Sequence, residues 1–238
     1  MLKCKNSKTN KFYISYLNKF RNLILENKNN LICPVCNEQV FFVDSIIKIK
    51  HFRHHPESSC KYSVGETEAH LSGKLKLIKL FGLSPEKNLE VYLGFARPDI
   101  YFEVNNKKCA VEFQNSRISA EEIIQRTKRY NEHDVYVLWI LSENMFSMEG
   151  DDEYRIVKLN HCIKYLHALY FGRIYVLENN ERVVPYHFKY INKKTRYILK
   201  GKPIINFTSF YIKTNEWYNN LKIFTFKDKI FWDILTWQ

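Results

Sequence analysis

Two carboxylates and a glutamine near the middle of the chain have the spacing of a metal site. Strand-forming residues lie on either side of Asn105-Asn106, which is typical of two strands joined by a two-residue turn. In that register Asp99 lies opposite Glu112, with the two side chains roughly 5 Å apart on one face. Gln114 shares this face because side chains alternate along a strand. Two carboxylates so placed repel, and a bound divalent cation is the simplest way to offset them.

A hairpin at the edge of a sheet, with its acids facing water, is the alternative interpretation of the same residues. The apolar surroundings argue against it, because an apolar run follows at 135–141 and apolar residues flank both acids. These flanking residues are Ile100, Phe102, Val111 and Phe113. The sequence therefore favours a metal site at the hairpin.

A second set of potential ligands lies upstream, in residues 31–62. Cys33 and Cys36 have the spacing of a zinc knuckle, and Cys60 is a third sulfur ligand. The fourth ligand is His54 or His51, and the spacing does not decide between them. A redox Cys-x-x-Cys pair normally opens a helix, whereas a strand-like run follows here. We therefore predict a structural zinc ion, which so short a segment needs because it cannot build its own core.

The pattern of residues 64–81 predicts a helix that carries further polar groups. Glu66, His70 and Lys74 recur every four residues and so lie on one stripe. Ordinary solvent-face pairing explains the stripe as well. In the functional interpretation, Glu66 is a third acid aimed at the hairpin and His70 contacts phosphate.

The order of the remaining elements predicts an α/β core. We expect a strand at Leu89–Leu93, the hairpin, a helix capped by Ser119, and a strand at 135–141 that is covered on both faces. A helix at 154–170 and strands at 173–177 and 183–190 follow. Aromatic residues alternate with lysines in the C-terminal part of the chain. This pattern suits stacking on single-stranded nucleic acid, but it more often belongs to an apolar core with one solvent-exposed face.

Composition limits the kind of partner. The chain has 238 residues, is 45% hydrophobic and carries a net charge of +12. These values exclude a disordered chain and point to a polyanion, with nucleic acid favoured over a membrane. Compositional drift toward lysine would raise the charge in the same way. We see no transmembrane run and no secretory signal, so we expect a cytoplasmic protein.

The motifs occur in one order between about residues 30 and 142, and their conjunction is more specific than any one of them. They are Cys33-Pro34-Val35-Cys36, His51-Phe52-Arg53-His54, Cys60, Glu66-Thr67-Glu68-Ala69-His70, Lys74, Arg97-Pro98-Asp99, Glu112-Phe113-Gln114-Asn115-Ser116, Arg126-Thr127-Lys128-Arg129-Tyr130 and Trp139-Ile140-Leu141. In this order the chain resembles the competence protein CoiA-like family of the PD-(D/E)XK nuclease superfamily.

The resemblance implies a restriction-endonuclease-like α/β fold in which helices flank a mixed sheet, preceded by a small zinc-stapled module. We expect a zinc-finger-like region at 1–62, a nuclease core at 63–149 and an α/β extension at 150–238. The implied activity is Mg²⁺- or Mn²⁺-dependent hydrolysis of DNA, single-stranded or branched DNA included, in DNA processing or recombination.

The site residues are assigned on the same basis. Asp99, Glu112 and Glu66 would hold the catalytic metal together with the carbonyl of Phe113, and Gln114 would orient the water. The predicted DNA contacts are His70, Lys74, Ser116 and Arg126. Gln114 stands where the wider superfamily has a lysine, so the group that activates water is unassigned; Lys108, Lys74 or a second metal could fill the role. A non-catalytic DNA-binding accessory protein and an RNA-directed enzyme are the competing functions.

Overall fold

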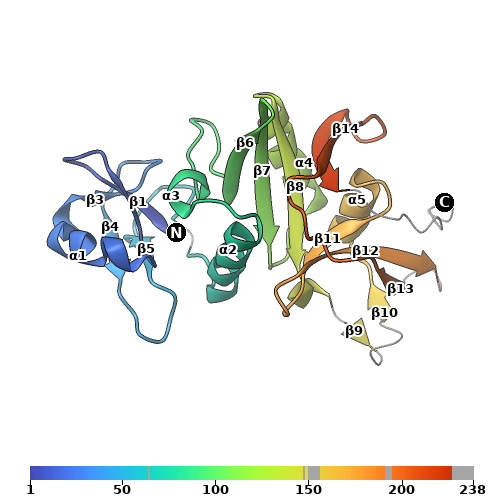
Figure 1. The fold of residues 1–238 in the computed structure, drawn as a ribbon, viewed down its shortest axis with the longest axis horizontal. Helices are drawn as coiled ribbons and strands as arrows, with labels where there is room; N and C mark the ends of the chain where they lie inside the picture. Colours follow the sequence, from blue (N-terminus) through green and yellow to red (C-terminus); the bar gives the residue numbers. More distant parts are fainter. Residues whose placement is uncertain (64, 147, 150–155, 191–194, 227–238) are drawn as a thin grey trace. The chain divides into compact units, whose positions relative to one another are not determined.

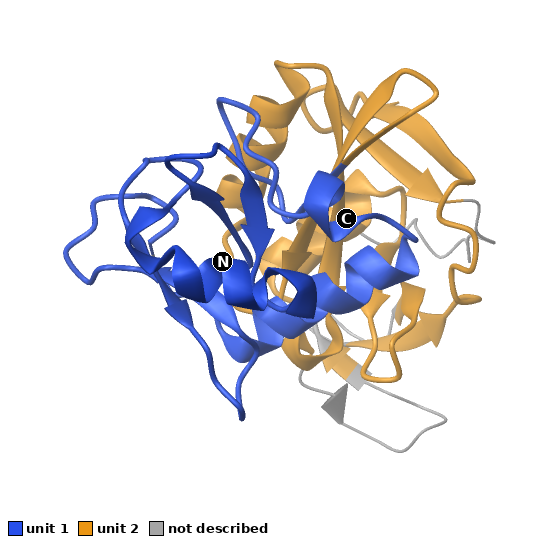
Figure 2. Cartoon of the chain, turned by 60° about the vertical axis from the view of Figure 1, so that its left-hand side comes forward, with its two compact units in different colours: residues 1–101 blue, residues 102–238 orange. Residues whose placement is uncertain are grey.

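The computed structural model describes the chain except residues 64, 147, 150–155, 191–194 and 227–238. The chain divides into two compact units, Met1–Tyr101 and Phe102–Gln238, which Figure 2 shows in different colours. This boundary differs from those expected from the sequence, and the division into three regions stays a prediction. Each unit is described by itself below.

The first unit begins with a small three-stranded sheet and a hairpin. An antiparallel sheet of order β2-β1-β3 comprises β1 (Lys3–Asn6), β2 (Phe12–Ile14) and β3 (Leu31–Ile32). Helix α1 (Asn18–Glu26) and the short 3₁₀ helix η1 (Lys28–Asn30) connect the last two strands. A hairpin follows, formed by β4 (Val40–Val43) and β5 (His51–His54). Residues 1–30 thus form two strands, one short α-helix and one 3₁₀ helix.

The helix predicted at 64–81 is α2 (Glu68–Leu80), and the hydroxyl of Thr67 caps it by accepting a hydrogen bond from the His70 amide at 3.2 Å. The short helix α3 (Pro85–Asn88) comes next. The strand predicted at Leu89–Leu93 is wrong, because only Leu89 forms an isolated bridge, to Ile100. The reason is that Glu90 has a φ of +46°, which breaks an extended chain and turns its carboxylate into the interior.

The central hairpin is confirmed. Strands β6 (Ile100–Val104) and β7 (Lys107–Gln114) pair with each other, and only Asn105 and Asn106 lie between them. Both asparagines have positive φ, +49° and +58°, as a tight two-residue hairpin turn requires. Asparagine tolerates this conformation better than most residues, which explains the Asn-Asn pair.

The second unit is built on a large mixed sheet (Figure 1). Its centre is β8 (Val135–Ser142), whose side chains are almost all buried, as the run without alternation predicted. One edge of β8 pairs in parallel with β7, and β11 (Ile174–Leu177) and β15 (Leu221–Phe226) share the other edge, also in parallel. Antiparallel strands extend the sheet: β9 (Met148–Glu149), β10 (Ile156–Lys158), β12 (Val183–Tyr190), β13 (Thr195–Lys200) and β14 (Phe210–Asn215).

Two helices cover this sheet. Helix α4 (Ala120–Asn131) packs against β8 and β15, and Ser119 caps it by accepting a hydrogen bond from the Glu122 amide at 3.0 Å. Helix α5 (His161–Leu169) packs against β11 and α4. It is shorter than the helix expected at 154–170, because 156–158 form a strand and 150–155 lie outside the described residues. The short 3₁₀ helix η2 (Glu143–Met145) follows β8.

The predicted fold class is confirmed: the chain has a mixed α/β core flanked by helices and a small N-terminal module with three cysteines and a histidine together. In the tail, Phe207, Phe224 and Phe226 are buried, whereas Trp217 is 90% exposed. Phe231, Trp232 and Trp237 lie outside the described residues. Among the helices that the structure describes, none combines the length and the apolar character needed to cross a membrane.

Candidate functional site

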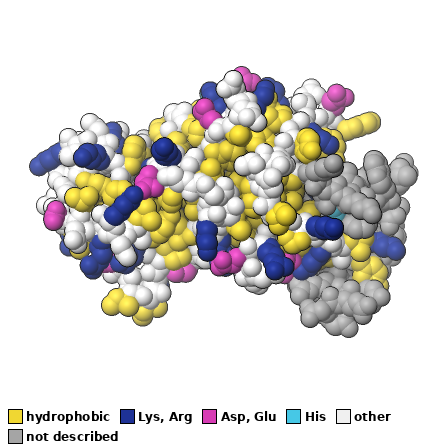
Figure 3. All heavy atoms as spheres, in the orientation of Figure 1, with side chains coloured by type: hydrophobic (Ala, Val, Ile, Leu, Met, Phe, Trp, Pro, Cys, Tyr) yellow, Lys and Arg dark blue, Asp and Glu magenta, His cyan; other side chains and the backbone are white. Residues whose placement is uncertain are grey.

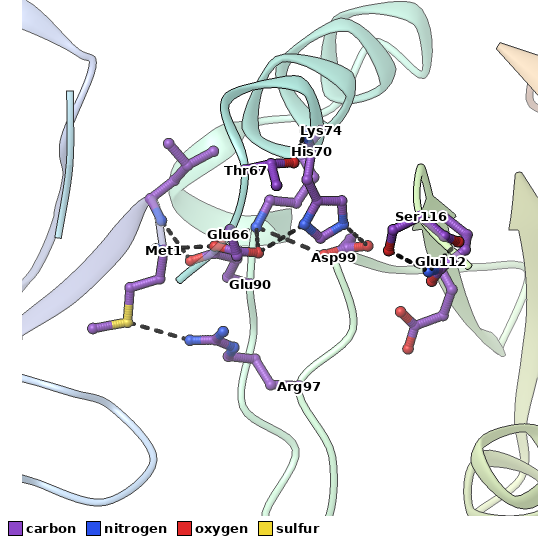
Figure 4. Close-up of polar contacts among 12 residues, drawn as sticks. Met1, Glu66, Thr67, His70, Lys74, Glu90, Arg97, Asp99, Glu112 and Ser116 are labelled. Carbon is purple, nitrogen blue, oxygen red and sulfur yellow. Dashed lines mark hydrogen bonds and ion pairs between the residues drawn. The ribbon is translucent and has the colours of Figure 1, made fainter. Parts of the chain in front are cut away.

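A cluster of acidic and basic side chains lies in the first unit, around the N-terminal end of α2 (Figure 4). His70 is held between two acids: its Nδ1 lies 3.1 Å from Glu66 Oε1 and its Nε2 lies 3.3 Å from Asp99 Oδ2. Lys74, one turn further along α2, places its Nζ 2.5 Å from Glu66 Oε1 and 3.7 Å from Asp99 Oδ1. The stripe predicted from the four-residue spacing is therefore a set of mutual contacts rather than a solvent face.

Burial and neighbouring opposite charges shift the pKa values in this cluster in opposite directions, and the opposite charges have the larger effect. Burial alone would lower the pKa of His70, but Asp99 and Glu66 raise it to about 10. Burial would likewise raise the pKa of Asp99, but His70 and Lys74 lower it to about 2. The pKa of Glu66 is held well below its ordinary value against burial, chiefly by Lys74. At neutral pH all of these groups are therefore charged.

Glu90 completes the cluster and was missed from the sequence. Its Oε1 pairs with Lys74 Nζ, and the carboxylate is only 2% exposed. In the strand predicted at Leu89–Leu93, Glu90 lies between two apolar residues, which is the pattern of an ordinary side chain that faces solvent. The alternation of apolar residues therefore concealed it.

Lys74 does not lie at the surface, where a residue that contacts DNA is expected. Its side chain is fully buried and paired with three carboxylates, those of Glu66, Glu90 and Asp99. Burial lowers the pKa of Lys74, but these carboxylates outweigh that effect and raise it above its ordinary value. A contact with phosphate would require Lys74 to leave its partners, so this role stays a prediction that the contacts do not favour.

The other predicted carboxylate lies in the second unit, where α4 holds it. Glu112 is 1% exposed; the hydroxyl of Tyr130 donates to its Oε1 at 2.6 Å, and Arg126 pairs with its Oε2. The Arg126 guanidinium also lies over the ring of Trp139, 4.9 Å from the centroid. Arg126, predicted to contact DNA, is thus the charge partner of the acid, and its role toward DNA stays a prediction.

Gln114 lies at the end of β7 with its amide directed at the following loop. Its Nε2 donates to the carbonyl and the hydroxyl of Ser116, at 3.0 and 3.2 Å. The neutral amide brings no charge to the site, but Ser116 fixes its orientation. Ser116 is exposed, and its predicted contact with DNA is untested.

The sequence argument invoked a cation to offset the repulsion between Asp99 and Glu112. In the structure each acid has cationic side chains of its own unit beside it, Lys74 and His70 for Asp99 and Arg126 for Glu112. Charge balance alone therefore does not require a metal. The donor set does fit one: a carboxylate oxygen of Glu66, a ring nitrogen of His70 and a carboxylate oxygen of Asp99 all lie within 4.8 Å of one another. Mn²⁺ suits such a set better than Mg²⁺, which prefers oxygen ligands.

The predicted zinc ligands also come together. Cys33, Cys36, His54 and Cys60 have their ligand atoms within 4.8 Å of one another, and Cys36 Sγ lies 3.5 Å from His54 Nε2. The Val35 amide donates to Cys33 Sγ at 3.4 Å, the kind of bond that stabilises a thiolate in a knuckle turn. His51, the alternative ligand, lies outside this group and contacts the Ile49 carbonyl through Nδ1 at 2.9 Å. Three sulfurs and one imidazole nitrogen fit a tetrahedral zinc site.

Comparison with known proteins assigns both parts of the chain to one family. The family model described as "Competence protein CoiA, nuclease-like domain" matches residues 66–214, and the one described as "Competence protein CoiA, N-terminal domain" matches residues 16–63. The search of curated proteins and the search of solved structures found no match. The first match contains the acidic cluster and Glu112, and the second contains the four cysteine and histidine ligands. The chain belongs to the competence protein CoiA family.

Proposed function

We propose that the protein is a metal-dependent nuclease that hydrolyses phosphodiester bonds of DNA. The observation that carries the proposal is the convergence of Glu66, His70 and Asp99 at the start of the central hairpin, inside the region matched by a nuclease-like domain. Carboxylates grouped with an imidazole are the ligands that Mn²⁺ accepts. The net charge of +12 suits a polyanionic substrate.

In this proposal Glu66, Asp99 and Glu112 bind the catalytic cation, with His70 as a further ligand. Glu112 is included because Asp99 leads directly into β6, which pairs with β7 through a two-residue turn. The pairing of these two strands thus supports Glu112 as a ligand of the same cation. When bound, the cation would lower the pKa of a coordinated water and neutralise charge on the phosphate.

The remaining residues orient the reactants. Ser116 holds the amide nitrogen of Gln114, which leaves Oε1 of Gln114 as the acceptor that orients the attacking water. Lys74 lies 3.7 Å from Asp99 and is the cation best placed to stabilise charge that develops beside that ligand. Lys108 is exposed at the start of β7 and less suited to this task.

Cleavage of single-stranded, duplex and branched DNA, and of RNA, with Mg²⁺, Mn²⁺ or neither metal tests the proposal. We expect metal-dependent cleavage of DNA that Asp99→Ala and Glu112→Ala each abolish. Glu103→Ala is the matched control, because it removes an exposed carboxylate from the same hairpin. Equal cleavage by the wild type and both site variants would refute the assignment, and cleavage of RNA alone would change the substrate.

A non-catalytic DNA-binding role in recombination is the second candidate, and one observation favours it. Both Asp99 and Glu112 already have charge partners in the protein, as buried acids of purely structural importance would. In Figure 3, Lys and Arg side chains are spread over the face in view rather than gathered in one patch. This candidate predicts that the protein binds DNA and cleaves none of the substrates with either metal.

A further inference from the structure

Glu90 is the most thoroughly buried acid of the first unit, and the proposed mechanism does not use it. Its side chain is 1% exposed. Its backbone has a φ of +46°, in the left-handed region that non-glycine residues rarely adopt. Such a conformation is strained and persists only where the surroundings enforce it. Contacts on several sides of Glu90 enforce it here.

These contacts tie Glu90 to three parts of the unit. Its Oε2 accepts hydrogen bonds from the backbone amides of Leu2 and Lys3, at 2.8 and 3.1 Å. Its Oε1 pairs with Lys74 Nζ, and its own amide donates to the carbonyl of Asp99 at 3.0 Å. Glu90 therefore fixes both the position of the Lys74 ammonium and the backbone of a proposed metal ligand.

The charge of Lys74 explains why this position matters. The ammonium lies 2.5 Å from Glu66 and 3.7 Å from Asp99, two of the proposed ligands, and it is fully buried. A buried cation beside two ligand oxygens competes with a divalent ion for the same carboxylates. Glu90 supplies a carboxylate that lies outside the metal group of Glu66, His70 and Asp99, and it takes up the charge of Lys74.

We propose that Glu90 is a positioning residue that anchors and neutralises Lys74, so that Glu66 and Asp99 are available to bind a divalent cation. This inference rests on the proposed metal-dependent function. A purely structural ion pair would stabilise the fold without changing metal affinity. The two roles therefore differ in how metal binding depends on Lys74.

Binding of Mn²⁺ to the full, zinc-loaded chain tests the inference by calorimetric titration. We expect Glu90→Gln to weaken Mn²⁺ binding by about tenfold or more, since residues that orient metal ligands change affinity by roughly 10–100-fold. Glu86→Gln is the matched control: it removes an acid four residues earlier that pairs with Lys19. Its Mn²⁺ affinity should equal that of the wild type.

A double-mutant cycle shows whether Glu90 acts through Lys74. Adding Glu90→Gln to Lys74→Met should cause no further loss, because the ammonium that Glu90 neutralises is gone. The double variant also keeps the net charge of the cluster, so Mn²⁺ binding can be measured on it even if Glu90→Gln alone does not fold. Its Mn²⁺ affinity should lie within about threefold of the wild type.

The outcomes separate this inference from the proposed function. If the wild type binds Mn²⁺ and Asp99→Ala abolishes binding, but Glu90→Gln binds as the wild type does, only the role of Glu90 is overturned. The same holds if Glu90→Gln weakens binding equally with and without Lys74. Failure of the wild type to bind Mn²⁺, or unchanged binding by Asp99→Ala, overturns the proposed site as well.

Discussion

The two units bury polar groups in different ways. In the first, charged side chains lie in the interior: Lys74 is fully buried among carboxylates, and three of the four potential zinc ligands, Cys33, Cys36 and Cys60, belong to the small apolar core or pack against it. In the second, buried acids such as Glu112 and Glu178 pair with basic side chains that are partly exposed, and neutral groups pair inside a large apolar sheet. The hydroxyl of Tyr170, for example, accepts from the Trp139 amide at 2.8 Å and donates to the Val137 carbonyl at 3.1 Å. The stability of the first unit should therefore depend on single charges and on a metal, and that of the second on apolar burial.

The two predicted active-site acids follow the same division. Asp99 belongs to a network of mutually paired charges, whereas Glu112 pairs with the guanidinium of Arg126 and accepts a hydrogen bond from the hydroxyl of Tyr130. Lys74 is fully buried, but the side chain of Arg126 is 32% exposed. Water can compensate the loss of Arg126 in part, and it cannot do so for Lys74.

Loss of zinc should have the largest effect and should be confined to the first unit. A structural zinc ion contributes apparent free energies of about 10–16 kcal/mol, which is comparable with the whole stability of a domain. We expect Cys60→Ser to lose zinc and to lose hydrogen-exchange protection in residues 31–60. All four tryptophans lie after residue 101, so their fluorescence should stay unchanged.

Cys162→Ser is the control for this experiment, because it removes a buried thiol from α5. It should retain zinc. Unchanged zinc content in Cys60→Ser would show that the four ligands do not form the metal site.

Removal of the buried ammonium should have the next largest effect. Lys74→Met leaves Glu66, Glu90 and Asp99 without their shared partner, and we expect a loss of about 3–5 kcal/mol in the free energy of unfolding. Arg126→Met leaves Glu112 with the Tyr130 hydroxyl and should cost about 1–3 kcal/mol. Urea unfolding followed by hydrogen exchange in each unit measures both. A larger loss for Arg126→Met would contradict the contrast between the units.

Two histidines, one in each unit, should contribute to the pH dependence of stability with opposite signs. Burial lowers the pKa of His167 to about 3. Its contribution to the second unit is therefore complete above pH 6.5 and is lost as the pH falls toward 3, by about 2 kcal/mol at pH 5. Tryptophan-detected unfolding at pH 5 and 7 measures the loss, which should be absent in His167→Gln.

His70 provides the opposite case in the first unit. Its pKa is raised to about 10, so without divalent cations its contribution is complete below pH 6.5 and is lost as the pH rises through 10. Hydrogen exchange in α2 should therefore accelerate at alkaline pH beyond its intrinsic dependence. If exchange in α2 kept only its intrinsic dependence as the pH rises toward 10, the charged state assigned to His70 would be wrong.

The helix caps should have the smallest effects, and they should be alike in the two units. Thr67→Ala and Ser119→Ala each remove a hydroxyl that accepts a hydrogen bond from the backbone in the first turn of a helix. We expect a loss of about 1 kcal/mol for each by urea unfolding. A much larger effect of Thr67→Ala would mean that the cap also supports the charged cluster.

The sequence predicted the features that depend on local pattern. Asn105-Asn106 specified the tight turn, the uninterrupted run at 135–141 specified a covered strand, and Ser119 marked the start of α4. The Cys-x-x-Cys pair with Cys60 located the cluster of potential zinc ligands, but only the structure showed that His54 rather than His51 belongs to it. His51 and His54 are three residues apart on β5 and therefore face opposite sides of the strand, and which side meets the cysteines depends on tertiary contacts.

Features that depend on tertiary contacts could not be predicted. Glu90 is buried by backbone amides from the start of the chain and by Lys74, groups 88, 87 and 16 positions away. Lys74 and Arg126 were expected to contact DNA from the resemblance to the nuclease family, and such a contact requires the basic side chain to lie at the surface. Glu66, Asp99 and Glu112, with which they pair, were themselves identified in the sequence as metal ligands, so the pairing of these charges with each other was overlooked.

The central claim is that Asp99 and Glu112 support metal-dependent DNA cleavage, and one measurement tests it most directly. DNA cleavage by the zinc-loaded chain is compared with and without Mn²⁺, for the wild type, Asp99→Ala, Glu112→Ala and the control Glu103→Ala. We predict that the wild type and the control cleave only with Mn²⁺ and that neither site variant cleaves. Metal-independent cleavage, or cleavage by both site variants at the wild-type rate, would contradict the claim.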